Sequence, residues 1–424
     1  MLNYNIGEMI KEFFLGRVNR IYTVLLVIFI SQGMMAQEID LLIRNGHVID
    51  PKNKIDSPMD VAVTGGKILM VAKSIPADKA KKVIDATGMY VTPGFIDLHT
   101  HVFVGSNQGF ADGFSCISPD DITLKAGITT VVDAGTSGWR NFPLFKKNVI
   151  DRSTTRVLAF LNIAGSGMTG FPSEEDKNDM DARMTSLVAG QYPDIIVGIK
   201  IGHYRGKDWI PFERAVEAAD IAKIPLFLEC HTPEYSLDEL LKRMSPGDIY
   251  SHTYCTASDR ECILDADGKL KSSVLEAQKK GVRFDVGHGG GMFHFDIAAP
   301  ALKQGLKPDS FGSDLHRSSI NSGMKNMLET MSKFLNLGMS LQEVINSATW
   351  SSASSIKRTD LGNIGAGAEA DIAIISVRKG TFGFIDTKNN KLTGDRRLEA
   401  ELTIKAGKVV WDMNGLAAKN WTNK

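Results

Sequence analysis

Apolar and polar positions follow three patterns along the chain. Residues 39–92 contain short runs rich in apolar and β-branched side chains, which alternate with glycine and asparagine turns, as in a small β-sheet domain. Residues 93–356 contain apolar runs of strand length, separated by stretches of helical period such as 212–223. Strand character returns at 370–376 and 402–411. We expect these last segments to complete the sheet that begins near the N-terminus.

The central segment has eight runs of strand length: 95–99, 129–133, 156–161, 196–200, 225–229, 248–252, 283–288 and 310–314. Strands that alternate with helices are typical of a parallel sheet. Eight such βα units in about 260 residues have the size of a (β/α)8 TIM-type barrel. The sequence therefore predicts an α/β fold, with a barrel at 93–357 and a small β-sandwich domain formed by both chain ends, 38–92 and 358–424.

Residues 1–37 follow a different pattern. Lys11, Arg17 and Arg20 precede the apolar run 21–30, and a small residue ends the segment soon after it. This order predicts a secretory signal peptide. An uncleaved membrane anchor is the alternative, but the run is shorter than the roughly 18 to 20 apolar residues that span a bilayer. We therefore expect cleavage, export to the periplasm, and no membrane contact afterwards.

The composition is that of an ordinary globular protein. Of 424 residues, 43% are hydrophobic and 23% are charged, which excludes a disordered chain, a collagen and a coiled coil. The 49 Lys and Arg residues balance the 49 Asp and Glu residues, so the chain lacks the basic excess that drives nucleic-acid binding. We expect a small-molecule substrate, and a homo-oligomer is left open.

Four cysteines are too few for a disulfide scaffold, although a bridge between Cys255 and Cys262 is left open.

Titratable side chains end several of the predicted strands. In a barrel of this kind, the carboxyl ends of the strands form the active site. His99 and His101 lie two residues apart at the end of the first strand, so both point to the same face and suit an ion such as zinc. His252 ends the sixth strand and Asp314 ends the eighth. Asp314 is a candidate metal ligand and also a candidate general base.

Lys200 ends the fourth strand. A lysine at the inner end of a buried strand has to be paired, neutral or modified, because an isolated buried ammonium is costly. A structural salt bridge is the alternative to a role in the site. His203 and Arg205 follow Lys200 closely, and they either line the pocket or belong to a solvated loop. Arg205 is the natural candidate for binding a substrate carboxylate.

The chain resembles the amidohydrolase superfamily, and most closely its dihydroorotase-like amidohydrolase/deacetylase branch. The resemblance rests on 91–101 (VTPGFIDLHTH), Lys200, His252, Asp314 and the tail 362–371 (GNIGAGAEAD), and it extends over all but the signal segment. It implies two divalent metal ions, usually zinc, in a barrel flanked by a β-sandwich. It also implies that CO2 carboxylates Lys200 and that the resulting carbamate bridges the two metals.

The fifth strand departs from the family pattern. The family usually has Pro-x-x-x-His here, whereas the fourth residue after Pro225 is Glu229, and His231 follows two residues later. Glu229 and His231 share a face, so either side chain could reach the metal. Because carboxylates are ordinary zinc ligands, we favour Glu229. His231 is kept as the alternative ligand or as a substrate contact.

His288 opens a glycine run after the seventh strand. The run resembles the oxyanion loop of esterases, but no Gly-x-Ser-x-Gly nucleophile elbow occurs in the sequence. The sequence therefore disfavours a serine hydrolase. We interpret His288 as a substrate contact, with a structural turn as the alternative.

These residues predict a metal-dependent hydrolase that cleaves an amide or ester bond. The expected substrates are N-acyl amino acids or acyl-hydroxy acids, attacked by a metal-bridging hydroxide, with Asp314 as base and then acid. A cyclic amidase like dihydroorotase and a phosphotriesterase-like hydrolase are the alternatives. A nucleobase deaminase is disfavoured because such members typically use one metal and no lysine on the fourth strand. A non-catalytic binding protein would hold no metal.

Overall fold

The computed structural model describes residues 38–170, 173–229, 234–257 and 260–421. The predicted signal segment, residues 1–37, and the alternative ligand His231 lie outside the described residues. Within the described ranges, no helix is long and apolar enough to cross a membrane.

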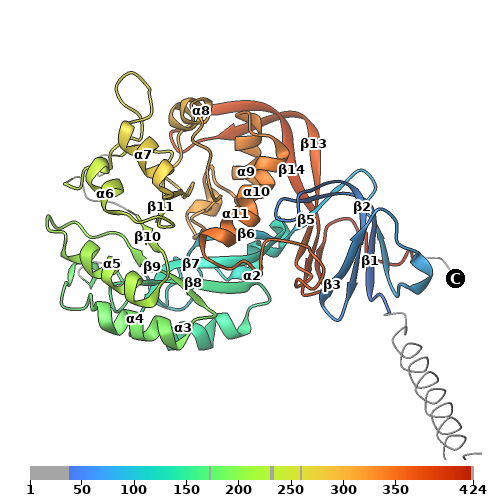
Figure 1. The fold of residues 1–424 in the computed structure, drawn as a ribbon, viewed down its shortest axis with the longest axis horizontal. Helices are drawn as coiled ribbons and strands as arrows, with labels where there is room; N and C mark the ends of the chain where they lie inside the picture. Colours follow the sequence, from blue (N-terminus) through green and yellow to red (C-terminus); the bar gives the residue numbers. More distant parts are fainter. Residues whose placement is uncertain (1–37, 171–172, 230–233, 258–259, 422–424) are drawn as a thin grey trace, which may run out of the picture.

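The central part of the chain forms a curled sheet of seven parallel strands in the order β12-β11-β10-β9-β8-β7-β6 (Figure 1). The strands are β6 (Phe95–Thr100), β7 (Ile128–Gly138), β8 (Arg156–Asn162), β9 (Ile196–Ile201), β10 (Leu226–Leu228), β11 (Ile249–Tyr250) and β12 (Arg283–Phe284). They confirm seven of the eight predicted strands. The eighth predicted strand, 310–314, forms no regular strand: Ser310 makes an isolated parallel bridge to Asp285, and Leu315, directly after the segment, makes one to Thr100. This segment therefore lies between the two edges of the sheet and closes the curl.

Helices surround the curled sheet (Figure 1). They are α2 (Pro119–Ile122), α3 (Phe142–Asn148), α4 (Ala182–Gln191), α5 (Ile210–Ala222), α6 (Leu237–Arg243), α7 (Ser272–Lys280), α8 (Phe295–Lys303), α9 (Met327–Asn336), α10 (Leu341–Ala348) and α11 (Trp350–Ser355). Short 3-10 helices occupy Ala77–Lys79, Leu124–Ala126, Ile150–Arg152, Ser173–Glu175 and Ser319–Asn321. Capping side chains fix several starts: Asp181 caps α4, Asn326 caps α9, and Ser340 with Glu343 forms a capping box on α10.

Strands from both chain ends form a second sheet, in the order β15-β14-β13-β5-β1-β2-β3, with β4 paired to β1. The strands are β1 (Leu41–Asp50), β2 (Ile55–Thr64), β3 (Lys67–Ala72), β4 (Val83–Asp85), β5 (Tyr90–Pro93), β13 (Ile372–Ile385), β14 (Lys391–Lys405) and β15 (Lys408–Asp412). The antiparallel pairing of β5 with β13 joins the two chain ends. The late strands thus complete the early sheet, as predicted, while its assembly into a two-layer sandwich and the exact domain boundaries stay predictions.

The hairpin of β13 and β14 leaves the chain-end sheet and runs past α9 and α10 toward α8 (Figure 1). The backbone N–H of Leu398 donates to Ser332 Oγ on α9 at 3.0 Å. At the tip of the hairpin, the backbone N–H of Thr387 donates to the carbonyl of Phe293 at 3.0 Å. The hairpin therefore ties the chain-end sheet to the loop before α8.

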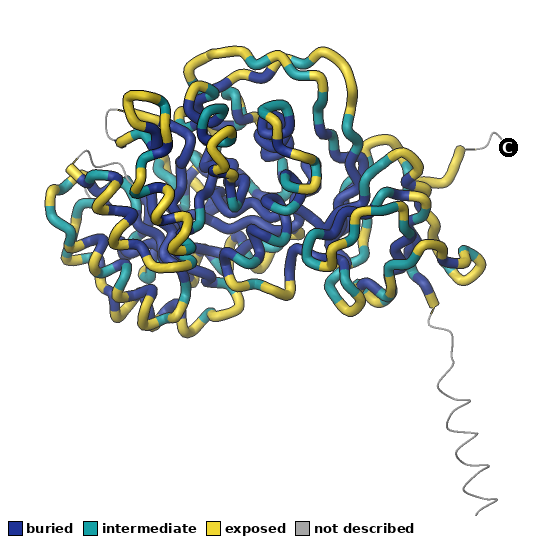
Figure 2. The backbone as a smooth tube through the Cα atoms, turned by 45° about the horizontal axis from the view of Figure 1, so that its top comes forward, coloured by how far each residue is buried: buried dark blue, intermediate teal, exposed yellow. Residues whose placement is uncertain are grey.

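The interior of the curled sheet is buried, and the exposed positions lie on the outer helices and loops (Figure 2). An apolar cluster joins residues of β6 to β11 with residues of α11 and the segment after it. Within it, Phe227 stacks on Phe160 with ring centroids 4.4 Å apart, and the His99 ring meets Phe227 edge-on at 5.1 Å. The apolar core thus forms a floor beneath the polar strand ends.

Candidate metal centre

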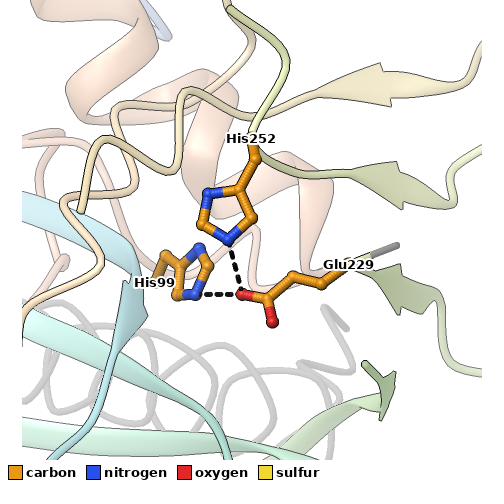
Figure 3. A group of neighbouring side chains, drawn as sticks. All are labelled: His99, Glu229 and His252. Carbon is orange, nitrogen blue, oxygen red and sulfur yellow. Dashed lines mark ion pairs between the residues drawn. The ribbon is translucent and has the colours of Figure 1, made fainter. Parts of the chain in front are cut away.

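Three side chains from different strand ends converge on one point. His99 lies in β6, Glu229 follows β10, and His252 follows β11 (Figure 3). Glu229 Oε1 lies 2.6 Å from His99 Nε2 and 3.1 Å from His252 Nε2. All three side chains are buried, so the group is closed to bulk water on most sides.

A second group shares His99. Asp314 Oδ1 lies 3.1 Å from His101 Nε2 and 3.6 Å from His99 Nε2. In each group, the three candidate ligand atoms lie within 4.8 Å of one another. The structure therefore brings together five of the residues predicted from the sequence, in two overlapping sets of nitrogen and oxygen donors.

These donors fit divalent metal ions. His99 Nε2 is buried 2.6 Å from Glu229 Oε1 and 3.6 Å from Asp314 Oδ1, yet it makes no well-directed hydrogen bond with a described residue. A cation between this nitrogen and the two carboxylates would satisfy all three groups. Imidazole with carboxylate is a donor set that suits zinc and similar ions.

Charge keeps both carboxylates ionised. Burial raises the pKa of Glu229, but the charges of Lys200, His99 and His252 outweigh it and hold this pKa well below its usual value. Burial also raises the pKa of Asp314, but His316 and His99 again outweigh it and leave this pKa well below its usual value. Two anions are thus held in the buried site, which favours a cation there.

Hydrogen bonds behind the imidazoles orient their rings. His99 Nδ1 lies 3.0 Å from Ser251 Oγ, which in turn donates to Asp285 Oδ2 at 2.7 Å. His252 Nδ1 donates to the carbonyl of Gly287 at 2.6 Å. In both residues Nε2 therefore faces the centre of the site, as in histidines that bind metals. Sequence reasoning missed Ser251 and Asp285, because their role depends on neighbours from other strands.

Three residues of the site also have a strained backbone. His203, His252 and Asp314 all have positive φ, at 63°, 57° and 50°. Non-glycine residues seldom adopt this region, which costs about 1–3 kcal/mol each and is often found at functional sites. The fold thus holds these three side chains in positions that an unstrained backbone would not give them.

Lys200 is fully buried and paired. Its Nζ lies 2.7 Å from Glu229 Oε2 and donates to the carbonyl of Ala134 at 3.0 Å. The ammonium also lies over the ring of Phe227, 5.3 Å from its centroid. Pairing with Glu229 satisfies the buried charge, and carboxylation of Lys200 stays a prediction.

A cavity of about 440 Å³ opens above the two donor groups. It is lined by His101, Phe110, Met168, His203, Glu229, His252, Gly290, Gly291, Met292, Asp314, His316, Ser318 and Ser322. A second cavity of about 430 Å³ adjoins it, because both are lined by Phe110, Met168 and His203. Phe110 and Met168 come from loops without a periodic pattern, so sequence reasoning missed them.

The predicted substrate contacts differ in their positions. Arg205 lines the second cavity and is exposed. His288 is fully buried, and its Nε2 lies 2.6 Å from Lys333 Nζ. It lies behind the glycine loop whose Gly290 and Gly291 line the first cavity, so its contact with substrate stays a prediction.

Cys255 and Cys262 are not joined to each other, and Cys255 Sγ lies 3.8 Å from Met292 Sδ.

Known proteins resemble this chain over most of its length. Residues 82–148 and 294–410 match two models of the amidohydrolase family. A deacetylase of Brucella anthropi is 31% identical over 330 residues, which are 76% of this chain and 80% of the relative. A deacetylase of Enterococcus faecalis is 30% identical over 377 residues, which are 87% of this chain and 98% of the relative.

Two solved structures share the fold. An adenine deaminase has a TM-score of 0.80 and 30% identity, and the match covers 89% of this chain and 100% of that one. A dihydroorotase has a TM-score of 0.75 and 27% identity, with 88% and 99% covered. The family predicted from the sequence is thus confirmed, and the chain belongs to the amidohydrolase superfamily as a metal-dependent hydrolytic enzyme.

Proposed function

We propose that this enzyme is a binuclear metal-dependent deacylase that hydrolyses an amide or ester bond in N-acyl amino acids or acyl-hydroxy acids. The observation that carries the proposal is the pair of donor groups, His99–Glu229–His252 and His99–His101–Asp314, beneath one cavity. The relatives that are named deacetylases support the deacylation. Residues 1–37 would direct the enzyme to the periplasm, and its oligomeric state is open.

The donor groups divide between two cation positions. His101 and Asp314 would hold one divalent ion, Glu229 and His252 the other, and His99 lies between them. Bound divalent ions lower the pKa of water and polarise a carbonyl group. We propose zinc, with Lys200 carboxylated by CO2, as the family resemblance implies. Lys200 Nζ lies 2.7 Å from Glu229 Oε2, so a carbamate on this side chain would lie beside the donor groups.

Asp314 is the proposed proton carrier. Its carboxylate lines the cavity and is ionised at neutral pH, because its pKa lies well below the usual value. It accepts the proton of the attacking water and then gives that proton to the leaving nitrogen or oxygen. His316 Nδ1 lies 3.3 Å from Asp314 Oδ1 and holds the carboxylate in place.

The cavity walls suggest how an acylated acid would bind. Phe110 and Met168 line both cavities and give them an apolar wall, which suits the hydrocarbon part of a small acyl compound. Arg205 lines the second cavity, where its guanidinium would bind the substrate carboxylate. The acyl group would then lie over the donor groups.

Metal analysis and a substrate panel test the proposal. Protein purified without chelator should hold near two divalent ions per chain and hydrolyse acetylated amino acids or hydroxy acids. The panel should include dihydroorotate, an aryl phosphotriester and adenine, the last because a similar solved structure is named an adenine deaminase. Turnover of one of these three alone would replace the proposal with that activity. Failure to bind metal, even with added zinc and bicarbonate, would indicate a binding protein.

A further inference from the structure

Lys333 is a buried amine that the proposed chemistry does not use. It lies on α9 with an exposed fraction of 0%. Its Nζ lies 2.6 Å from His288 Nε2 and donates to the carbonyl of Gly323 at 2.7 Å. His288 Nδ1 donates to the carbonyl of Gly289 at 2.9 Å, so Nε2 is the acceptor for Lys333. One amine thus bonds two loops that are distant in the sequence.

Both loops line the cavity above the donor groups. The loop after β12 contributes Gly290, Gly291 and Met292, and the loop after residues 310–315 contributes His316, Ser318 and Ser322. Gly323 directly follows the second set in the chain. Lys333 therefore fixes the separation of two cavity walls from behind.

The loop after β12 also contacts two residues of the donor groups. The carbonyl of Gly287 accepts the hydrogen bond of His252 Nδ1. Gly289 packs so closely on Asp314 that a Cβ there would lie 2.2 Å from Asp314 Oδ2. His288 stands between these two glycines, and its ring stacks on Phe293 with centroids 4.7 Å apart. A displacement of His288 would thus reach both His252 and Asp314.

We infer that Lys333 is a positioning residue: by holding His288 against the Gly323 loop, it sets the orientation of His252 and Asp314. Its role is transmitted through His288 and does not involve contact with substrate. The inference rests on the proposed hydrolysis for its effect on turnover, but its effect on metal retention is independent of the substrate.

The test compares Lys333→Met, Lys333→Gln, His288→Phe and the double variant K333M/H288F with the wild type. The control is Lys325→Met, which removes a half-exposed lysine of the Gly323 loop whose Nζ bonds Glu329 Oε1 and bonds neither His288 nor Gly323. Because partners behind metal ligands typically change activity or metal affinity by 10- to 100-fold, we expect K333M to lower kcat about 10-fold with little change in KM. Zinc loss to a chelator should accelerate by a similar factor.

The remaining variants separate positioning from a merely structural role. H288F and the double variant should lose no more kcat and no more zinc than K333M, because the effects of two residues that act through one contact do not add. K333Q keeps a hydrogen-bond donor and should recover part of kcat; it also replaces K333M if that variant does not fold. Three outcomes would each overturn the inference. The first is that kcat and the rate of zinc loss do not change in K333M and K333Q. The others are additive losses in the double variant and an effect of K325M equal to that of K333M. If the wild type hydrolyses none of the panel, the proposed function fails, and the zinc-loss rates still decide the role of Lys333.

Discussion

Glu229 Oε2 lies 2.7 Å from Lys200 Nζ, so the fifth-strand residue that departs from the family pattern is the partner of the fourth-strand lysine. The pair is buried, and each residue compensates for the desolvation of the other. A histidine at position 229 would leave Lys200 without this carboxylate. The departure from the family pattern on the fifth strand therefore supplies the partner of the lysine on the fourth strand.

Replacing Lys200 by Ala should release metal and destabilise the fold. In the metal-free protein, where Lys200 is an unmodified ammonium, the Glu229 carboxylate would lose its buried partner, and breaking a buried pair from one side costs about 3–5 kcal/mol. We expect at least one metal position to empty in K200A, measured as metal per chain. Added short carboxylates such as formate or acetate should restore part of the metal and the activity. Full occupancy without rescue would contradict a bridging role for a carboxylated Lys200.

Replacing Asp314 by Asn should affect turnover more than metal binding. The amide keeps an oxygen donor but cannot accept the proton of the attacking water, a step worth about 100- to 10,000-fold in rate. D314N should therefore lose kcat by such a factor and retain much of its metal, as determined on the same protein sample. Equal losses of metal and turnover would show that Asp314 acts only as a ligand.

Paired variants distinguish the two candidate metal ligands at the end of the fifth strand, Glu229 and His231. E229Q should weaken metal binding strongly, because Glu229 Oε1 contacts both His99 and His252. H231Q serves as its matched partner and should keep near-wild-type metal content. Zinc titration of the metal-free proteins measures both. Loss of metal in H231Q with retention in E229Q would assign His231 as the ligand.

Removing the Arg205 guanidinium should reveal whether the substrate carries a carboxylate. A charged hydrogen bond contributes about 1.5–3 kcal/mol, so R205M should raise KM for an acylated acid roughly 10- to 100-fold. The control is the same substrate as its neutral amide, for which the two proteins should have similar KM. Equal effects on both substrates would exclude carboxylate recognition by Arg205.

Lys333 should make the stability of the metal-free protein depend on pH. Burial lowers the pKa of Lys333 to about 7, from 10.5 for an ordinary lysine. Between these values the unfolded chain binds more protons than the folded chain, so stability rises with pH. From pH 7 to pH 9, the titration of Lys333 should add about 2 kcal/mol to the free energy of unfolding.

Urea unfolding of the metal-free wild type and K333M at both pH values measures this gain. The difference in unfolding free energy between the two proteins should shift in favour of the wild type at pH 9. If the difference in unfolding free energy does not change with pH, Lys333 has the same pKa in the folded and the unfolded protein.

The apolar runs were sufficient to predict seven strands and the pairing of both chain ends, because buried strands and hairpins leave local patterns. The segment 310–314 was predicted as a strand, yet it and the adjacent Leu315 pair only through single bridges. Hydrogen-bond ladders depend on neighbours that are distant in the sequence, and no local pattern encodes them.

The candidate ligands were predictable because each stands at a strand end, whereas their supporting residues were not. Lys333 follows Glu329 by one helical turn, a spacing typical of an exposed ion pair. In the structure Lys333 is fully buried, and Glu329 pairs with Lys325 and Arg397 instead. Only the packing of the two loops against α9 gives this lysine its partners.

The pairing of β5 with β13 also sets an order of events during synthesis. Until residues 372–385 leave the ribosome, β5 has β1 on one side and an open edge on the other. Open strand edges pair readily with other chains, so the nascent protein passes most of its synthesis with an incomplete sheet. If residues 1–37 direct export, as proposed, this delay is useful, because the sheet cannot close before the last strands of the protein have been made.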